Sequence, residues 1–192
     1  MSEQQHRAWV QAAKQGDEYA FTCLVKAYQD KIYSLAYYVT QNHQDAEDVT
    51  QEVFLKLWRS MDSYREDASV QAWIMQIAKH ACFDLLRKRK RTATESLYTE
   101  RDGEQVERPL ADPDGQSNPA EVVAEQDRRQ SMERALLALP PEYREVLTLR
   151  YINGLSYEQI TQVLGQPEGT VKSRLFRAKK SLKNILENGN FF

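Results

Sequence analysis

The sequence predicts an all-α protein made of two small helical domains joined by a flexible acidic linker. Three observations favour this fold class: apolar residues recur at helical spacing in both halves, strand-like alternation is absent, and the middle of the chain is rich in Pro, Gly and acidic residues. We expect an N-terminal helical bundle over 1–91, the linker over 92–127, and a C-terminal helix-turn-helix domain over 128–188. The length of 192 residues suffices for two such units.

The composition is that of a soluble globular protein, with 41% hydrophobic and 28% charged residues. No apolar run is long enough to predict a membrane span, and the first residues carry charges throughout, so no secretory signal is expected. Cys23 and Cys82 lie in apolar helical stretches without a Cys or His at ligand spacing, which indicates buried thiols. We therefore expect a cytoplasmic protein without a metal or other cofactor.

The N-terminal half contains three apolar stripes at helical spacing, which predict the helices of a bundle. They consist of Phe21, Leu24, Val25, Tyr28, Ile32, Leu35 and Ala36; Val49, Val53, Phe54, Leu57 and Trp58; and Trp73, Ile74, Ile77, Ala81 and Leu85. The third stripe leads directly into five consecutive cations, "RKRKR", at 87–91.

The linker separates two basic regions, although the whole chain has a net charge of only −2. The segment 92–127 contains ten acidic residues, two basic residues (Arg101 and Arg108) and few large apolar residues. Between 156 and 184 six basic residues outnumber two acidic ones. This segregation indicates that charge acts locally, at two basic surfaces on either side of an acidic connector.

The C-terminal half ends in the pattern of a helix-turn-helix, "LSYEQITQVLGQPEGTVKSRLFRAKKSL". Gly154 is expected to end one helix, and Ser156 with Gln159 forms a capping box that begins the next. After the break at "GQP", the second helix has an inner stripe of Val171, Leu175, Ala178 and Leu182. The residues left to face outward or obliquely suit the DNA major groove, and they are Thr170, Lys172, Ser173, Arg174, Phe176, Arg177 and Lys180. The alternative is a solvated basic face on a structural helix.

Three carboxylates, Asp45, Asp48 and Glu52, recur on one face of the helix predicted from "DAEDVTQEVFLKLWR". They could form a solvated face near a helix start, a divalent-metal site, or a docking surface for a basic partner. Catalysis is disfavoured because no accompanying His or Lys constellation is evident.

A polar loop between Tyr64 and Trp73 precedes the helix that ends in the basic run. Aromatic rings beside cations are typical of single-stranded nucleic-acid sites, because bases stack on rings while Lys and Arg follow the phosphates. A core position for Trp73 fits the pattern equally well.

These motifs, in this order, resemble those of bacterial extracytoplasmic-function RNA polymerase sigma factors. "DAEDVTQEVFLKLW" resembles the family's polymerase-docking helix, "AWIMQIAKHACFDLLRKRKR" its promoter-melting helix, and the segment from "LPPEYREVL" to "RAKKSL" its fourth-region helix-turn-helix. The resemblance implies a transcription initiation factor without catalytic residues, small-molecule substrate, metal or other cofactor. Its expected partners are core RNA polymerase, through the clamp helices of the largest subunit and the flap of the second-largest, and promoter DNA.

The resemblance also implies roles for individual residues. Polymerase binding falls on Asp48, Gln51 and Glu52. Binding and melting of the downstream (minus-ten) promoter element fall on Ser63, Tyr64, Arg65, Asp67, Trp73, Lys79, His80, Asp84 and Arg87. Reading of the upstream (minus-thirty-five) element falls on Thr170, Lys172, Ser173, Arg174, Phe176 and Arg177.

The chain departs from the family pattern at two positions, with His80 where Asn is common and Thr161 where Ala is usual. His80 puts the downstream sequence preference in doubt. The acidic linker stands where larger sigma factors have a third domain, and its charge could mimic RNA in the polymerase channel. The family also implies an anti-sigma factor, which could hold the protein at the inner face of the membrane.

Two other functions remain open on the residues alone. One is a stand-alone helix-turn-helix regulator that binds DNA without polymerase. The other is a metal-dependent nucleic-acid enzyme that uses Asp45, Asp48 and Glu52. The promoters read, the inducing signal and the anti-sigma factor cannot be predicted from the sequence.

Overall fold

The computed structural model describes residues 2–95 and 119–188, with 92–95 and 119–125 described by their backbone alone. Within these ranges the chain forms helices and no strand, which confirms the all-α prediction. The expected linker 92–127 contains the end of one helix and the start of another, and its central part, 96–118, lies outside the described residues. No helix in the described ranges is both long and apolar enough to cross a membrane.

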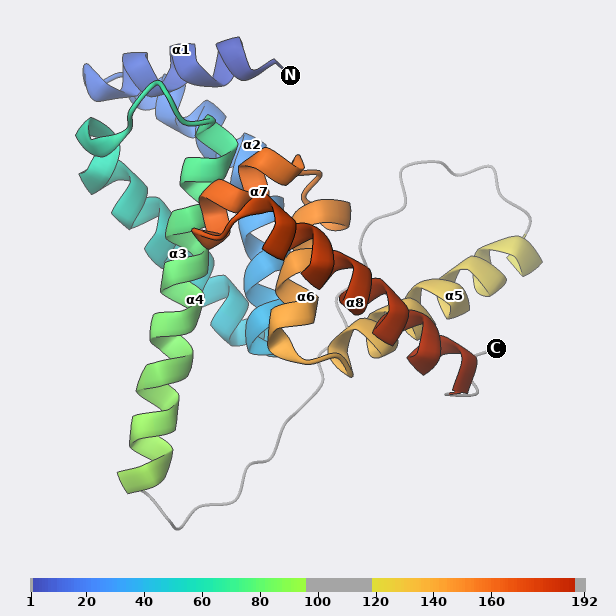
Figure 1. Ribbon diagram of the computed structural model, residues 1–192. Coiled ribbons are helices and arrows are strands. Elements are labelled where there is room, and N and C mark those ends of the chain that lie inside the picture. Colours follow the sequence, from blue (N-terminus) through green and yellow to red (C-terminus); the bar gives the residue numbers. More distant parts are fainter. Residues whose placement is uncertain (1, 96–118, 189–192) are drawn as a thin grey trace.

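The N-terminal half is a bundle of four helices whose starts are capped by side chains (Figure 1). Ser2, Asp17 and Asn42 each accept a backbone N–H in the first turn of the helix that follows. The elements are α1 (Glu3–Lys14), α2 (Glu18–Thr40), α3 (His43–Ser60), the short 3₁₀ helix η1 (Met61–Ser63) and α4 (Val70–Glu95).

The predicted apolar stripes form the core of this bundle. Tyr28, Ile32 and Leu35 of α2 are fully buried, and Val49, Val53 and Leu57 of α3 are at most 1% exposed. Trp58 also lies in the second stripe but is 43% exposed, and its ring packs edge-on against Phe21. Cys82 is buried and Cys23 half-buried, and both are free thiols.

The C-terminal half consists of α5 (Pro119–Leu137), α6 (Pro141–Leu147), α7 (Tyr157–Leu164) and α8 (Glu168–Asn188). A π-helical turn, η2 (Thr148–Ile152), extends α6, and Gly154 follows with a φ of +71°, which a glycine adopts without strain. The predicted capping box of Ser156 and Gln159 is present at the start of α7. Gly165 ends α7 in the left-handed conformation.

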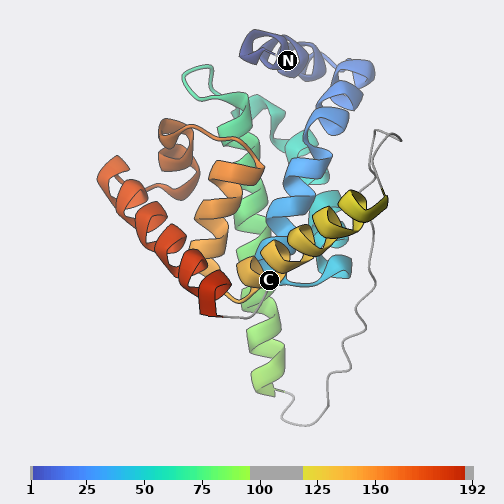
Figure 2. The same ribbon diagram turned by 90° about the vertical axis from the view of Figure 1, so that its right-hand side faces the viewer.

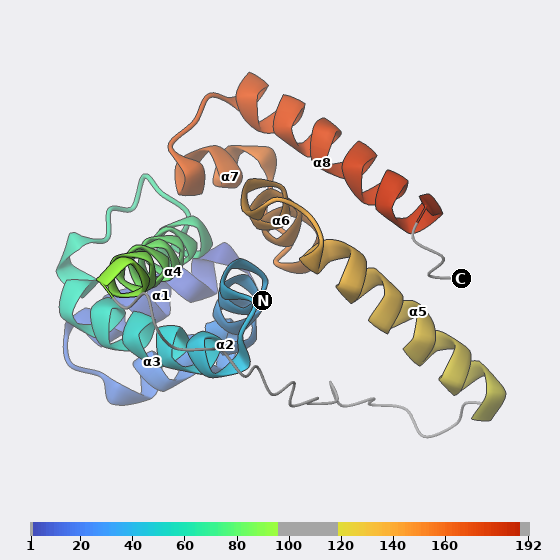
Figure 3. The same ribbon diagram turned by 90° about the horizontal axis from the view of Figure 1, so that it is seen from below.

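The two halves pack side by side, with α7 against α4 and α6 against α2 (Figures 1 and 3). Asn153 lies at the centre of this contact and is 2% exposed. Its Oδ1 accepts a hydrogen bond from the Ser34 hydroxyl at 2.9 Å, and its Nδ2 donates to the Lys31 carbonyl and the Met75 sulfur. The backbone carbonyl of Asn153 accepts from Gln71 Nε2 at 2.7 Å. One buried residue thus joins α2 and α4 to the C-terminal half.

Candidate nucleic-acid interface

The helix-turn-helix is formed by α7, the turn after Gly165, and α8, at one flank of the molecule (Figure 2). Val171, Leu175 and Ala178 are at most 3% exposed and fix the inner face of α8, as the spacing predicted. The opposite face is exposed and carries Thr170, Lys172, Ser173, Phe176, Arg177, Lys179 and Lys180, while Arg174 is half-buried. A protruding helix with this composition has the shape and charge that suit a DNA major groove.

The side chains of this face are partly ordered by contacts within α7 and α8. Lys172 forms an ion pair with Glu168 at 2.6 Å, and this carboxylate raises the pKa of the lysine. Arg177 donates from Nε to the Ser173 carbonyl at 3.3 Å. Phe176 is 69% exposed and neighbours the exposed Arg177 in the sequence of α8. Phe176 and Arg177 therefore lie where a ligand would meet them first.

A second candidate surface lies on α3, where Asp48, Gln51 and Glu52 are all exposed. Asp48 accepts a hydrogen bond from Gln44, and Glu52 forms an ion pair with Lys56 at 2.7 Å. Leu55 is 59% exposed one turn further along α3 and was not singled out from the sequence, although its spacing from Glu52 places it on the same face. This face, which we call the α3 docking face, combines acidic groups with an exposed apolar side chain.

Asp45 does not share this environment. It is 5% exposed and forms an ion pair with Arg89 of α4, one of the five cations of the basic run. The three carboxylates therefore do not converge, and residues 2–95 and 119–188 hold no cluster of three potential metal ligands. These contacts give no support to a metal-dependent reaction at this face.

The loop between η1 and α4, residues 64–69, is built around Tyr64. Its ring is 4% exposed and packs against Trp73, with the centroids 5.1 Å apart, and its hydroxyl donates to the Ala68 carbonyl at 2.9 Å. Tyr64 therefore shapes the loop from inside, whereas Arg65 and Asp67 are exposed. Ser63, just before the loop, is also exposed.

The predicted residues on α4 occupy different environments. His80 is exposed, and Asp84 and Arg87 form an exposed ion pair at 3.3 Å. Lys79 instead donates to the Val163 and Leu164 carbonyls at the end of α7, 3.1 and 3.4 Å away. Its ammonium group thereby satisfies backbone acceptors that the end of a helix leaves without partners. In this conformation Lys79 joins the two halves of the molecule.

Glu145 of α6 has a buried carboxyl group and is 4% exposed. Its Oε1 has no hydrogen-bond partner within the described part of the chain. Burial raises the pKa of Glu145 from 4.5 to about 6, and the positive charges of Lys79 and Arg174 oppose part of that rise. Between these two pKa values the folded protein binds more protons than the unfolded chain. The stability of the fold therefore falls as the pH rises through this window.

Glu145→Gln is expected to raise the free energy of unfolding by about 2 kcal/mol at pH 7.5 and to have little effect at pH 4.5, because it removes the cost of burying a charge. Urea unfolding of the two proteins at both pH values measures this difference. Glu158→Gln, at an exposed position on α7, is the matched control. An equal change at both pH values would contradict a titrating Glu145.

Known proteins share both regions of the chain. A family model described as Sigma-70 region 2 matches residues 24–92, and one described as Sigma-70, region 4 matches residues 129–182. The chain is 34% identical over 187 residues to the RNA polymerase sigma-H factor of Pseudomonas aeruginosa, covering 97% of this chain and 96% of the relative. It is 36% identical over 189 residues to the ECF RNA polymerase sigma-E factor of Escherichia coli, covering 97% of each.

Two solved structures share the fold. CnrH in complex with the cytosolic domain of CnrY has a TM-score of 0.66 at 22% identity, covering 95% of this chain and 97% of that one. The sigma factor RpoE in complex with the anti-sigma factor NepR from Bartonella quintana has a TM-score of 0.68 at 24% identity, covering 88% and 97%.

Proposed function

This chain belongs to the extracytoplasmic-function sigma factors of the sigma-70 family, and on that premise we propose how its surfaces divide the work of transcription initiation. A protein of this family binds core RNA polymerase and directs it to promoters. We assign recognition of the upstream element to α8, promoter melting to the η1–α4 loop and α4, and polymerase binding to the α3 docking face. The observation that carries the assignment is that one chain presents both the exposed basic face of α8 and the acidic, partly apolar face of α3.

Polymerase binding is assigned to Asp48, Gln51 and Glu52, together with Leu55. Exposed charges at such a contact contribute mainly to orientation and association rate, while an apolar side chain contributes affinity when it is buried by the partner. The largest-subunit clamp helices are the proposed partner of this face, and the flap of the second-largest subunit is the proposed partner of the C-terminal half.

Promoter melting is assigned to exposed side chains around the η1–α4 loop, Ser63, Arg65 and Asp67, with His80, Asp84 and Arg87 following along α4. Flipping one base out of the duplex costs a few kcal/mol, which contacts to the extruded base must offset. Tyr64 and Trp73 contribute indirectly, since their packed rings support the conformation of the loop. Lys79 can reach DNA only after it releases the end of α7.

We further propose that the protein has no catalytic activity of its own and works in the cytoplasm, where polymerase and chromosome are found. An anti-sigma factor is a proposed partner, because the solved structures of similar fold include a sigma factor bound to one. A stand-alone DNA-binding regulator is the less favoured alternative, since region 2 would then have no role.

The proposal is tested by charge reversal on the α3 docking face. Asp48→Lys and Glu52→Lys are each expected to weaken association with core polymerase roughly tenfold, mostly through a slower association rate, because a basic partner surface would now be repelled. The measurement is binding of the labelled full chain to purified core enzyme at low and high salt, with promoter-specific transcription as a second readout.

Asp30→Lys, an exposed acid-to-base change on α2, is the matched control. If the Asp48 and Glu52 variants bind core polymerase as tightly as this control, the docking assignment is wrong. If the unaltered protein binds promoter DNA strongly without polymerase and does not bind core enzyme, the regulator alternative is favoured.

A further inference from the structure

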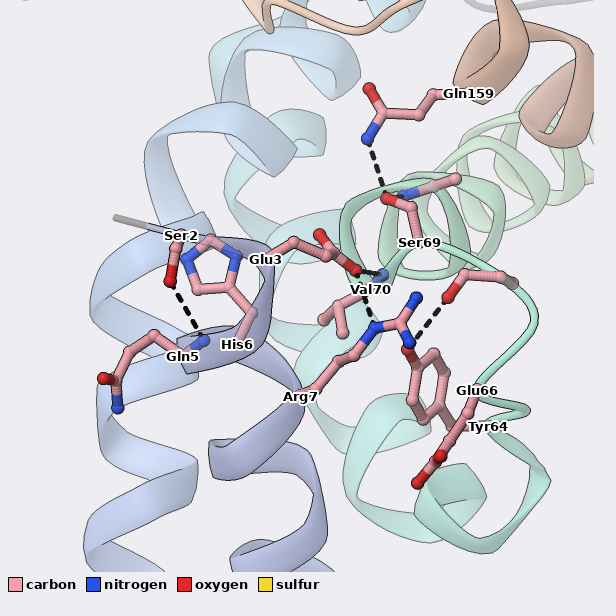
Figure 4. Close-up of polar contacts among 12 residues, drawn as sticks. Ser2, Glu3, Gln5, His6, Arg7, Tyr64, Glu66, Ser69, Val70 and Gln159 are labelled. Atoms are coloured by element: carbon pink, nitrogen blue, oxygen red, sulfur yellow. Dashed lines mark hydrogen bonds and ion pairs between the residues drawn. The ribbon is translucent and has the colours of Figure 1, made fainter.

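The N-terminal helix α1 lies outside both regions matched by the family models, yet it contacts the η1–α4 loop through a row of polar side chains. Glu3, Arg7, Gln11 and Lys14 recur at spacings of four, four and three residues, so they lie along one face of α1. Three of them make hydrogen bonds to the loop or to the start of α4. Figure 4 shows Glu3 directed toward Val70 and the Arg7 side chain directed toward Tyr64.

Each bond holds a different part of the loop. At its start, Lys14 Nζ donates to the Tyr64 carbonyl at 3.2 Å and lies 5.7 Å from the centre of the Tyr64 ring. In the middle, Gln11 Nε2 donates to Glu66 Oε1 at 2.7 Å. At its end, the Val70 N–H donates to Glu3 Oε1, also at 2.7 Å. The exposed side chains of Arg65 and Asp67 lie between these attachment points.

The Glu3 contact also completes the cap of α4. The Ser69 hydroxyl accepts from the Ala72 N–H, and the Glu3 carboxylate accepts from the Val70 N–H, so two donors at the start of the helix are satisfied. A negative charge at a helix N-terminus is favourable because of the helix dipole. A carboxylate from a different helix thus fixes the point at which the loop becomes α4.

α1 is itself packed firmly against α2, so its contacts can hold the η1–α4 loop in one conformation. Val10 is fully buried and Ala13 is 5% exposed. His6 is 8% exposed, and its Nδ1 shares a hydrogen bond of 2.8 Å with the hydroxyl of the buried Tyr28. These contacts anchor α1 to α2, so its polar row forms a fixed surface beside the loop.

We propose that α1 positions the promoter-melting loop, with Glu3 and Lys14 as positioning residues that act through the Val70 N–H and the Tyr64 carbonyl. The inference rests on the assignment of melting to this loop. A preformed loop captures an extruded base without first being ordered, so the loss of either attachment slows promoter opening. Polymerase binding and upstream recognition use α3 and α8, and neither depends on these attachments.

The experiment compares Glu3→Ala and Lys14→Ala in complex with core polymerase on two templates. One is a duplex promoter and the other the same promoter with a premelted, mismatched downstream element; a fluorescent base analogue reports opening or capture. On the duplex each variant is expected to open about tenfold more slowly, the effect of losing one charge-assisted hydrogen bond. On the duplex, capture must compete with re-pairing of the extruded base, whereas a mismatched base has no partner to re-pair with and stays available until the loop orders. We therefore expect less than about a twofold change in capture on the premelted template.

Glu3→Gln keeps an oxygen acceptor for the Val70 N–H and is expected to recover most of the opening rate, while Gln4→Ala, at an exposed position of α1, is the control. Equal slowing on both templates, or a slow Gln4→Ala variant, would mean that α1 acts only through general stability and would overturn the proposal.

Arg65→Ala distinguishes the assignment of melting to the loop from the assignment of loop positioning to α1. If it slows opening while Glu3→Ala and Lys14→Ala do not, the loop melts DNA but α1 does not position it; if none of the three does, both assignments fail.

Discussion

Asn153→Ala is expected to separate the two halves of the protein. The side chain of Asn153 makes three hydrogen bonds, and all its partners, Lys31, Ser34 and Met75, belong to α2 and α4. Removing it deletes these three hydrogen bonds across the contact, at a cost of about 2–4 kcal/mol. Small-angle scattering of the full chain should show a larger radius of gyration, and thermal unfolding should divide into two transitions.

The same variant also tests whether α4 is covered in the free protein. Lys79 should lose its acceptors at the end of α7 when the halves separate, which would leave its ammonium group free for other partners. Asn184→Ala, at an exposed position near the end of α8, is the matched control. A scattering profile identical to that of the unaltered protein would show that the Asn153 hydrogen bonds do not hold the halves together.

The second large effect is expected on α8, where alanine substitutions should divide into two classes. Arg177 is exposed and presents the end of its guanidinium group, so Arg177→Ala should cost about 1–3 kcal/mol of binding and relax selectivity at one base pair. Lys172 lies in the first turns of α8, where a helix N-terminus favours a phosphate, so Lys172→Ala should weaken all promoters alike and lower the salt slope by about one.

The measurement is transcription by the polymerase complex across a library of upstream elements at two salt concentrations. Phe176→Ala and Arg174→Ala extend the series, and Arg174 should show the smaller effect because it is half-buried near Glu145. Lys183→Ala is the control, since Lys183 lies on α8 but pairs with Glu187 further along the helix. If the Lys172 and Arg177 variants match the control in both selectivity and salt slope, α8 does not read DNA.

Local patterns were sufficient to predict much of this fold. The inner stripe of α8 and the capping box of α7 depend on residues within one or two turns of each other, so helical period and cap chemistry determine them. The end of α7 at Gly165 is also locally determined, because a positive φ suits a residue without a side chain. The exposed residues of α8 follow once its buried stripe is known.

Contacts between distant segments were not predictable in the same way. Asn153 and Ser34 are 119 positions apart, and neither belongs to an apolar pattern, so nothing local indicates that they meet. The hydrogen bond from the Val70 N–H to Glu3 was equally unpredictable from the sequence, because any exposed carboxylate could accept it. Tyr64 shows a related limit: an aromatic residue beside a polar loop is typical of both a stacking site and a packed support, and only the tertiary contacts reveal that it is buried.

The length of α4 sets a spacing between its two ends. The η1–α4 loop precedes Val70, the basic run begins at Arg87, and the C-terminal part of α4 extends below the bundle in Figure 1. An α-helix rises 1.5 Å per residue, so these points are about 26 Å apart along a rigid rod. At about 3.4 Å per nucleotide, a stacked DNA strand touching both ends must span seven or eight nucleotides. If the loop captures a base and the basic run contacts phosphates, as proposed above, the distance between that base and those phosphates is fixed by the number of α4 residues between them.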